Sequence, residues 1–220
     1  MSYWSSVTGL PIIIISSFRT GSTLLAKQLE KEFISRGETP VLFHEPGLAS
    51  NNGTPKSLIN FTEYVKNGNR DYILKVHGHD LIAPSFKNNQ WVNKYPDDLK
   101  NIRDNAKFLI RIRRNNVIEQ CASAYLTSVR QKWHYFVTNR LLTNEKIQID
   151  YAHLRHSVSG TLLANAICNM FPNQLFDLDL KYEDIDWSTI DMSLVLIPTP
   201  KPSNYEQLLI ACAEVLDEIK

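Results

Sequence analysis

The chain has 220 residues, of which 43% are hydrophobic and 21% are charged, and its formal net charge is +1. This length allows one domain with a sizeable core, and the small net charge gives no reason to expect nucleic acid or a membrane as a partner. The N-terminus lacks the basic and apolar segments of a secretory signal, and the scattered cysteines suit a reducing compartment. We therefore expect a cytoplasmic protein in which residues 1–220 form a single domain.

Short apolar segments alternate with helical patterns along the chain. The apolar segments, which we predict to be strands of one sheet, are residues 11–17, 40–44, 71–77, 107–113 and, with an alternating pattern that suits the side of the sheet, 175–182. Helical patterns begin at Ser22, Thr54, Tyr151 and residue 203, and another follows Asn115, which we predict to be its cap. This alternation predicts an α/β fold with a parallel β-sheet flanked by helices. In such sheets, ligands bind beyond the carboxyl ends of the strands.

The first predicted strand ends in the stretch SSFRTGSTLL, residues 16–25, which has the outline of a phosphate-binding loop. When Gly21 is aligned with the second glycine of the pattern G-x-x-x-x-G-K-[ST], Ser16 replaces the first glycine and Ser22 replaces the lysine. The positive charge has moved to Arg19, inside the loop. The alternative is an ordinary polar turn between a strand and a helix, which gives Arg19 no packing role.

The backbone of this loop suits a phosphate even without the lysine. The amides of residues 20–23 would point into the turn, and the start of a helix adds partial positive charge. Gly21 tolerates a positive φ and would let a phosphate approach closely. We therefore predict that the loop holds a phosphate whose neighbouring group is contacted by Arg19, without the lysine and magnesium of the usual pattern.

The segment FRTGSTLL, residues 18–25, resembles the 5′-phosphosulfate-binding loop of the sulfotransferase superfamily, which reads roughly [KR]-[ST]-G-[ST]-[ST]-x-[LW]. The chain is most similar to the bacterial and carbohydrate-type members. The resemblance implies a P-loop-like α/β fold and transfer of a sulfonyl group from 3′-phosphoadenosine-5′-phosphosulfate (PAPS), with adenosine 3′,5′-bisphosphate as product and no metal required. It also implies that Arg19 contacts the bridging oxygen and the sulfonyl group. The residues that it assigns to the 5′-phosphate are Thr20, Gly21, Ser22, Thr23 and Leu24.

A second family element is an arginine followed by a serine, which together bind the 3′-phosphate of the donor. The stretch RNNVIEQCAS resembles it, with Arg114 at the end of the fourth strand and Ser123 nine residues later. The spacing leaves Arg113 and Arg114 both open, and we favour Arg114. We interpret Arg111 as part of a solvated strand end. In the late segment TPKPSNYEQLL, Lys201 is a further candidate for the 3′-phosphate.

Two residues compete for the role of general base that takes the acceptor proton. Glu45 in FHEPG follows the second strand and resembles a segment of carbohydrate sulfotransferases that use a glutamate. His77 in LKVHGH follows the third strand and resembles a segment of cytosolic sulfotransferases that use a histidine, whose unperturbed pKa suits neutral pH. We favour Glu45 and assign Lys75 at most a positioning role. A metal site formed by His77 and His79, with His44 as a third ligand, is the other interpretation, but no fourth ligand has suitable spacing.

Together these features predict a PAPS-dependent sulfotransferase that acts on a hydroxyl or amine of a carbohydrate or small-molecule acceptor. The alternatives are a P-loop kinase-like phosphotransferase and a catalytically inactive nucleotide-binding domain. Trp133 and the loops 46–60, 78–95 and 130–150 would form the acceptor pocket, whose composition does not predict a substrate. The segment YEDI, residues 182–185, resembles a family segment that we interpret as structural, and the cysteines as core residues. The oligomeric state is not predicted.

Overall fold

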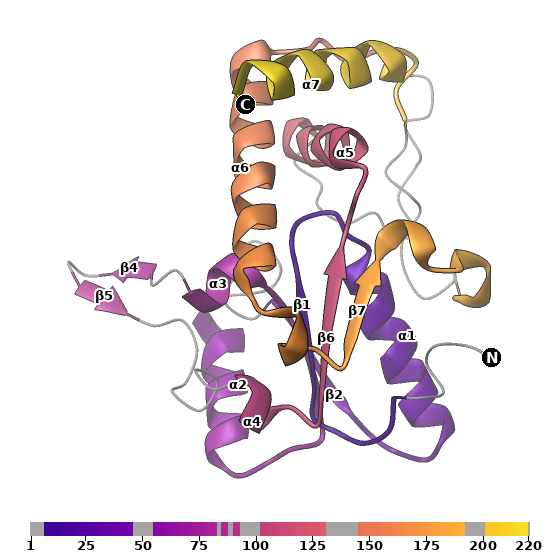
Figure 1. Cartoon of the computed structure of the whole chain (residues 1–220). Helices are drawn as coiled ribbons and strands as arrows, with labels where there is room; N and C mark the ends of the chain where they lie inside the picture. The colour runs from indigo at the N-terminus through magenta and orange to yellow at the C-terminus, as the bar shows by residue number, and fades with distance from the viewer. Residues whose placement is uncertain are drawn as a thin grey trace.

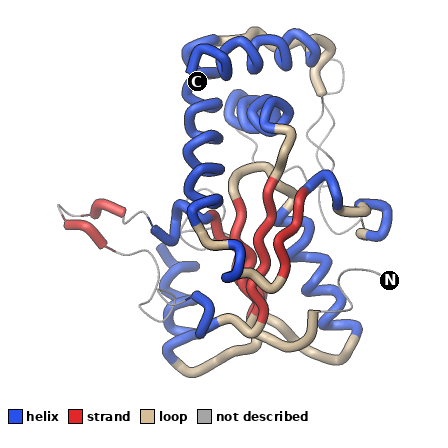
Figure 2. Tube along the Cα trace, viewed as in Figure 1, coloured by secondary structure: helices blue, strands red, loops and turns tan. Residues whose placement is uncertain are grey.

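The computed structural model describes residues 7–45, 55–82, 85–87, 90–92, 102–130, 145–191 and 201–219. Its centre is a five-stranded sheet in the order β2-β3-β1-β6-β7, in which every neighbouring pair is parallel (Figures 1 and 2). The strands are β1 (Ile12–Ser16), β2 (Val41–His44), β3 (Tyr72–His77), β6 (Phe108–Arg113) and β7 (Leu178–Lys181). The predicted α/β fold with a parallel sheet flanked by helices is therefore confirmed, and so is the place of the alternating fifth segment at the side of the sheet.

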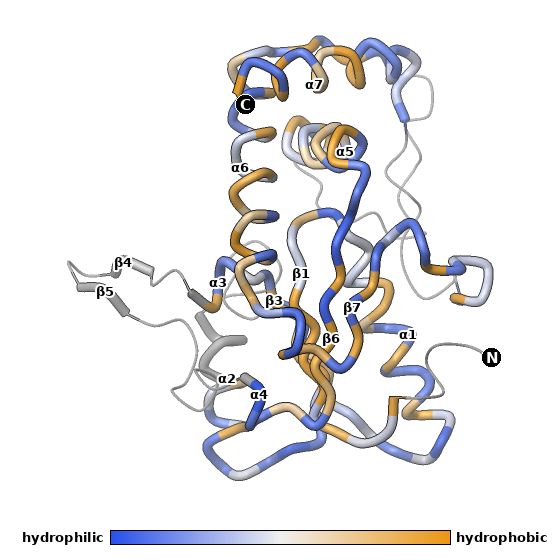
Figure 3. The backbone as a smooth tube through the Cα atoms, in the orientation of Figure 1, coloured by the Kyte–Doolittle hydropathy of each residue, from blue (hydrophilic) through white to orange (hydrophobic). Residues whose placement is uncertain are grey.

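Helices cover both faces of the sheet because alternate side chains of each strand point to opposite faces. On one face, Ile12 and Ile14 of β1 pack against Leu25 and Leu29 of α1 (Ser22–Ser35). On the other face, Ile13 and Ile15 pack with residues of α2 (Pro55–Lys66) and with the end of α6 (Tyr151–Met170). β1 is buried on both faces, which explains why its sequence is an unbroken apolar run rather than an alternating one (Figure 3).

A second core lies beyond the carboxyl ends of the strands. It is built from α5 (Val117–Val129) and α7 (Tyr205–Ile219), which lie above the sheet in Figure 1, and from the part of α6 that extends up beside them. The cysteines are buried and free, as predicted, and burial raises the pKa of the Cys121 and Cys168 thiols to about 11 and that of Cys212 to about 12. The remaining elements are α3 (Gly78–Ile82), β4 (Ser85–Lys87), β5 (Gln90–Val92), α4 (Ile102–Asn105), and the short 3-10 helices at Asn173–Leu175, Tyr182–Asp184 and Trp187–Thr189. No helix in the described ranges is long and apolar enough to cross a membrane.

The interpretation of Arg111 as a solvated strand end is wrong. Its side chain is fully buried, and its guanidinium pairs with Asp179 of β7 at 2.5 Å and donates to the carbonyl oxygen of Phe171 at the end of α6. A buried charge is tolerated where it is paired in this way, so Arg111 joins two strands and a helix end rather than facing solvent. A smaller correction concerns α5, whose cap is Asn116 and not Asn115, because the Asn116 side chain accepts the amide proton of Glu119.

Candidate functional site

The residues that the sequence predicts for the site gather at the carboxyl end of β1, the middle strand. β1 lies between β3 and β6, so the loop that follows it has β2 and β3 on one side and β6 on the other. Arg19 and Glu45 are the two non-glycine residues with positive φ in the described part of the chain, with φ values of 55° and 44°. Such conformations are strained and tend to occur at functional sites, where the surrounding structure enforces them. Both belong to the set predicted as catalytic.

The loop after β1 is closed by its own side chains. The Ser16 hydroxyl donates to the Ser22 hydroxyl at 2.9 Å, and the Thr20 hydroxyl donates to the Ser17 carbonyl oxygen at 3.2 Å. The side chain of Ser22, at the position of the usual lysine, is therefore directed to the end of β1. What remains for a ligand is the backbone at the start of α1, where the first helical hydrogen bond is donated by the Leu25 amide to Gly21. The preceding amides have no acceptor within the helix, and the first turn carries no acidic residue.

Gly21 has the positive φ that the sequence predicts, at 77°, and caps α1. The structure adds a further reason for the glycine, beside its positive φ. A Cβ at this position would lie 2.5 Å from Cη2 of Trp187 and 3.2 Å from Cδ2 of Tyr182. The close approach at Gly21 is therefore made by an aromatic pair that follows β7, and a side chain there would displace it.

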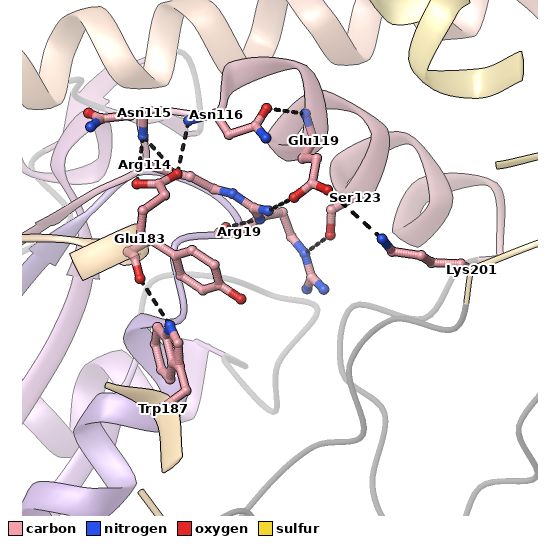
Figure 4. A network of polar contacts seen from close by, with 10 residues as sticks. Arg19, Arg114, Asn115, Asn116, Glu119, Ser123, Glu183, Trp187 and Lys201 are labelled. Atoms are coloured by element: carbon pink, nitrogen blue, oxygen red, sulfur yellow. Dashed lines mark hydrogen bonds and ion pairs between the residues drawn. The ribbon is translucent and has the colours of Figure 1, made fainter. Parts of the chain in front are cut away.

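Two segments that are far apart in sequence meet at Arg19. Its Nε donates to the Ser123 hydroxyl of α5 at 2.9 Å, across 104 residues (Figure 4). Arg114 donates from Nη1 to the Arg19 carbonyl oxygen at 3.2 Å, and its guanidinium carbon lies 4.5 Å from the centre of the Tyr182 ring. Arg113, the other arginine left open by the spacing, turns away and pairs with Asp179 at 2.6 Å. The structure thus brings Arg114, rather than Arg113, next to the loop.

Further side chains that the sequence analysis did not single out hold this corner in place. The buried Gln120 amide donates to the Phe18 carbonyl oxygen at 2.5 Å and to the Ser17 hydroxyl at 3.0 Å, so α5 fixes the backbone just before Arg19. The Glu183 carboxylate accepts hydrogen bonds from the amides of Asn115 and Asn116, the two residues before α5, which confirms a structural role for the YEDI segment. The only sequence signal for Gln120 is a polar residue beside the apolar face of a predicted helix.

The two candidate bases are neighbours rather than independent alternatives. Glu45 Oε1 lies 2.9 Å from His77 Nε2 and also forms an ion pair with the Lys75 ammonium, and all three residues are buried. Burial lowers the pKa of His77 well below its usual value, and the nearby charge of Lys75 lowers it further. Burial also lowers the pKa of Lys75, with Asp80 opposing this shift and Arg19 adding to it. The Phe18 ring lies edge-on to the His77 ring at 4.8 Å, which connects this cluster to the loop.

The other predicted residues lie further out or outside the described ranges. Lys201 is mostly exposed, with Nζ 3.8 Å from Glu119 Oε1. His44 contacts the Thr23 hydroxyl through Nε2 at 2.8 Å, so one of the histidines considered for a metal is engaged at the start of α1. Among the described residues, no group of three or more His, Cys, Asp and Glu side chains is arranged to hold a metal ion. Trp133 and most of the loops predicted for the acceptor, 46–60, 78–95 and 130–150, lie outside the described residues.

No protein-family model and no curated protein matches this chain.

Proposed function

We propose that this protein is a sulfotransferase that takes PAPS as donor and a hydroxyl or amine of a carbohydrate or other small molecule as acceptor. The observation that carries the proposal is the hydrogen bond between Arg19 and Ser123. The two residues come from separate motifs, and family resemblance assigns one motif to the sulfonyl end of the donor and the other to its 3′-phosphate. Their meeting at one end of a parallel sheet is what a shared nucleotide would require.

The chemistry of this corner fits a ligand with two separate phosphate groups. The start of α1 offers backbone amides and no competing acid in its first turn, which suits the 5′-phosphate. Arg114 and Ser123 offer a guanidinium and a hydroxyl for the 3′-phosphate, and Arg114 Nε is buried without a hydrogen-bond partner among the described residues. Both places therefore offer hydrogen-bond donors, from backbone N–H groups, a guanidinium or a hydroxyl, and these are the groups that bind phosphates.

PAPS, when bound, would supply an activated sulfonyl group joined to the 5′-phosphate. The task of Arg19 and of the amides at the start of α1 is to stabilise the negative charge that develops on that phosphate. Donors held in place by the fold can each contribute roughly 3 kcal/mol to such stabilisation. Gln120 supports this role because it fixes the Phe18 carbonyl next to Arg19.

Proton removal from the acceptor is assigned to Glu45 and His77 acting as a pair. Because the pKa of His77 is lowered, its imidazole is neutral near pH 7 and can accept a proton. The contact of Glu45 Oε1 with His77 Nε2 orients the ring and stabilises the imidazolium that forms, as the carboxylate of a catalytic triad does. Lys75 contacts the same carboxylate oxygen of Glu45 and so helps to hold it against His77.

Titration calorimetry with adenosine 3′,5′-bisphosphate tests the donor site. We expect wild-type protein to bind it, and we expect Arg19→Ala and Arg114→Ala each to weaken binding roughly tenfold or more, because each loses a charged hydrogen-bond donor. The matched control is Arg113→Ala, which removes the neighbouring arginine that pairs with Asp179 and should leave the affinity within about twofold. Failure of the wild-type protein to bind the bisphosphate would contradict the proposal.

Transfer itself requires an acceptor screen with PAPS, read by mass spectrometry as a sulfonate mass shift. Binding of the bisphosphate without transfer to any acceptor would favour the inactive nucleotide-binding protein. A P-loop kinase would instead bind ATP in a Mg²⁺-dependent manner. That alternative lacks a lysine at Ser22, whose hydroxyl is bonded to Ser16.

A further inference from the structure

The carboxylate of Glu119 lies between the two cations that the sequence analysis assigned to the 3′-phosphate. Its Oε2 accepts a hydrogen bond from Arg114 Nη2 at 2.8 Å, and its Oε1 lies 3.8 Å from Lys201 Nζ (Figure 4). The Arg114 side chain is only 10% exposed and that of Glu119 is 34% exposed. A guanidinium buried to this extent needs a counter-anion, and Glu119 provides it in this structure.

The position of Glu119 in α5 shows that it is not needed as a helix cap. It is the third residue of the helix after the cap Asn116, where a glutamate commonly bonds back to the amide of the cap residue. Here that amide is already taken by Glu183, which accepts from Asn116 N at 2.9 Å. The carboxylate of Glu119 therefore faces Arg114 and not the helix start.

Arg114 also has more donor capacity than its neighbours use. Nη1 donates to the Arg19 carbonyl oxygen and Nη2 to Glu119, while Nε is buried with no partner among the described residues. A guanidinium has five N–H donors, and a phosphate with three oxygen atoms can accept more of them than one carboxylate oxygen does. The site is thus built for a larger anion than the one that it holds.

We propose that Glu119 is an internal anion that occupies the subsite of Arg114 and Lys201, and that a ligand phosphate enters by displacing it. The identity of that phosphate as the 3′-phosphate of the donor rests on the proposed function. A dianionic phosphate outcompetes a single carboxylate for Arg114, so the bisphosphate binds, but less tightly than it would with a neutral residue at this position. The same competition shortens the residence of the product, whose release often limits turnover.

The test compares wild-type protein with Glu119→Gln, which removes the charge but keeps an oxygen that can accept from Arg114. Calorimetry should show the variant binding adenosine 3′,5′-bisphosphate about tenfold more tightly, the order expected for the loss of one competing charge in a partly exposed site. Affinity for adenosine 5′-monophosphate, which has no 3′-phosphate, should be unchanged. Stopped-flow measurement should place the gain for the bisphosphate in a slower dissociation rate. Glu119→Ala is a second variant with the same expected direction.

The matched control is Glu206→Gln, because Glu206 is an exposed acid in the first turn of α7. In the part of the chain that the structure describes, it forms no ion pair with Arg114 or Lys201. This variant has the same change in net charge and should bind as wild type does. An equal gain in Glu206→Gln would overturn the proposal. So would the absence of a gain in Glu119→Gln for a ligand, the bisphosphate or inorganic phosphate, that the wild-type protein binds, or the absence of binding of either ligand by Glu119→Gln.

Inorganic phosphate separates this inference from the proposed function. If neither protein binds the bisphosphate but Glu119→Gln binds inorganic phosphate more tightly than wild type, the sulfotransferase proposal fails and the role of Glu119 stands. If both proteins bind the bisphosphate equally, the role of Glu119 fails and the proposed function stands.

Discussion

The left-handed backbone at Arg19 can be tested by comparing Arg19→Gly with Arg19→Ala. Both variants lose the guanidinium and its bond to Ser123, so they should lose function equally, and their stabilities should differ only through the backbone. A Cβ in the left-handed region costs about 1–2 kcal/mol, and the extra freedom of glycine in the unfolded chain takes back about 0.5–1 kcal/mol. With φ at 55°, we therefore expect Arg19→Gly to be more stable than Arg19→Ala by about 1 kcal/mol.

Thermal and urea unfolding measure this difference, which corresponds to about 2–4 °C in Tm for a chain of this size. The control pair is Lys27→Gly and Lys27→Ala, because Lys27 lies inside α1, where glycine is less favourable than alanine by about 1 kcal/mol. The glycine variant should therefore be the more stable of the pair at position 19 and the less stable of the pair at position 27. If Arg19→Ala is as stable as Arg19→Gly or more stable, the strained conformation at Arg19, and the reasoning that links it to function, is refuted.

Two further predictions concern the same site. The pKa of His77 is lower in the folded protein than in the unfolded chain, so below about pH 6.5 the unfolded chain binds up to one more proton. The free energy of unfolding should therefore fall as the pH drops, by at most about 1.4 kcal/mol per pH unit from this residue. Urea unfolding at a series of pH values below about 6.5 should show a steeper loss of stability with falling pH in wild type than in His77→Gln, and equal slopes would contradict it. Gly21→Ala should lower the stability by about 2–4 kcal/mol, since its Cβ meets Trp187 and its φ is positive. Adding Trp187→Ala should recover only the part due to the clash, and a full recovery would show that the φ of 77° does not matter.

The order and type of the main elements could be predicted because the strands are apolar runs and the helices have a clear period. What sequence could not supply is contact between distant residues. Arg111 is an example, since a charged residue is expected to be exposed unless it is paired, and its partner Asp179 lies 68 residues away on a strand whose neighbour was not known. Glu119 is another: its place in the first turn of α5 is typical of a glutamate that bonds back to the cap amide, and the contact of that amide with the distant Glu183 shows that it does not.

The relation between the two candidate bases shows the same limit. From the sequence, Glu45 and His77 are separate strand ends that could each serve alone. In the structure β2 and β3 are adjacent, and their register pairs His44 with Lys75, so the residue that follows β2 falls beside the end of β3. The two alternative bases are therefore neighbours that can act together. The sequence does not show this, because it does not state the order of the strands, which decides which loops meet.

The order of the strands also has a consequence for how this protein could diversify. The groups suited to proton removal come from β2 and β3, on one side of β1, and the groups suited to anions come from β6 and α5, on the other side. On the proposed function, the segment from residue 41 to residue 82 could be exchanged between relatives to change the acceptor, while Arg114 and Ser123 keep the donor. Substitutions can therefore change one half of the site without changing the other. The loop with Arg19 lies between the two halves and contacts both, so it is constrained by both.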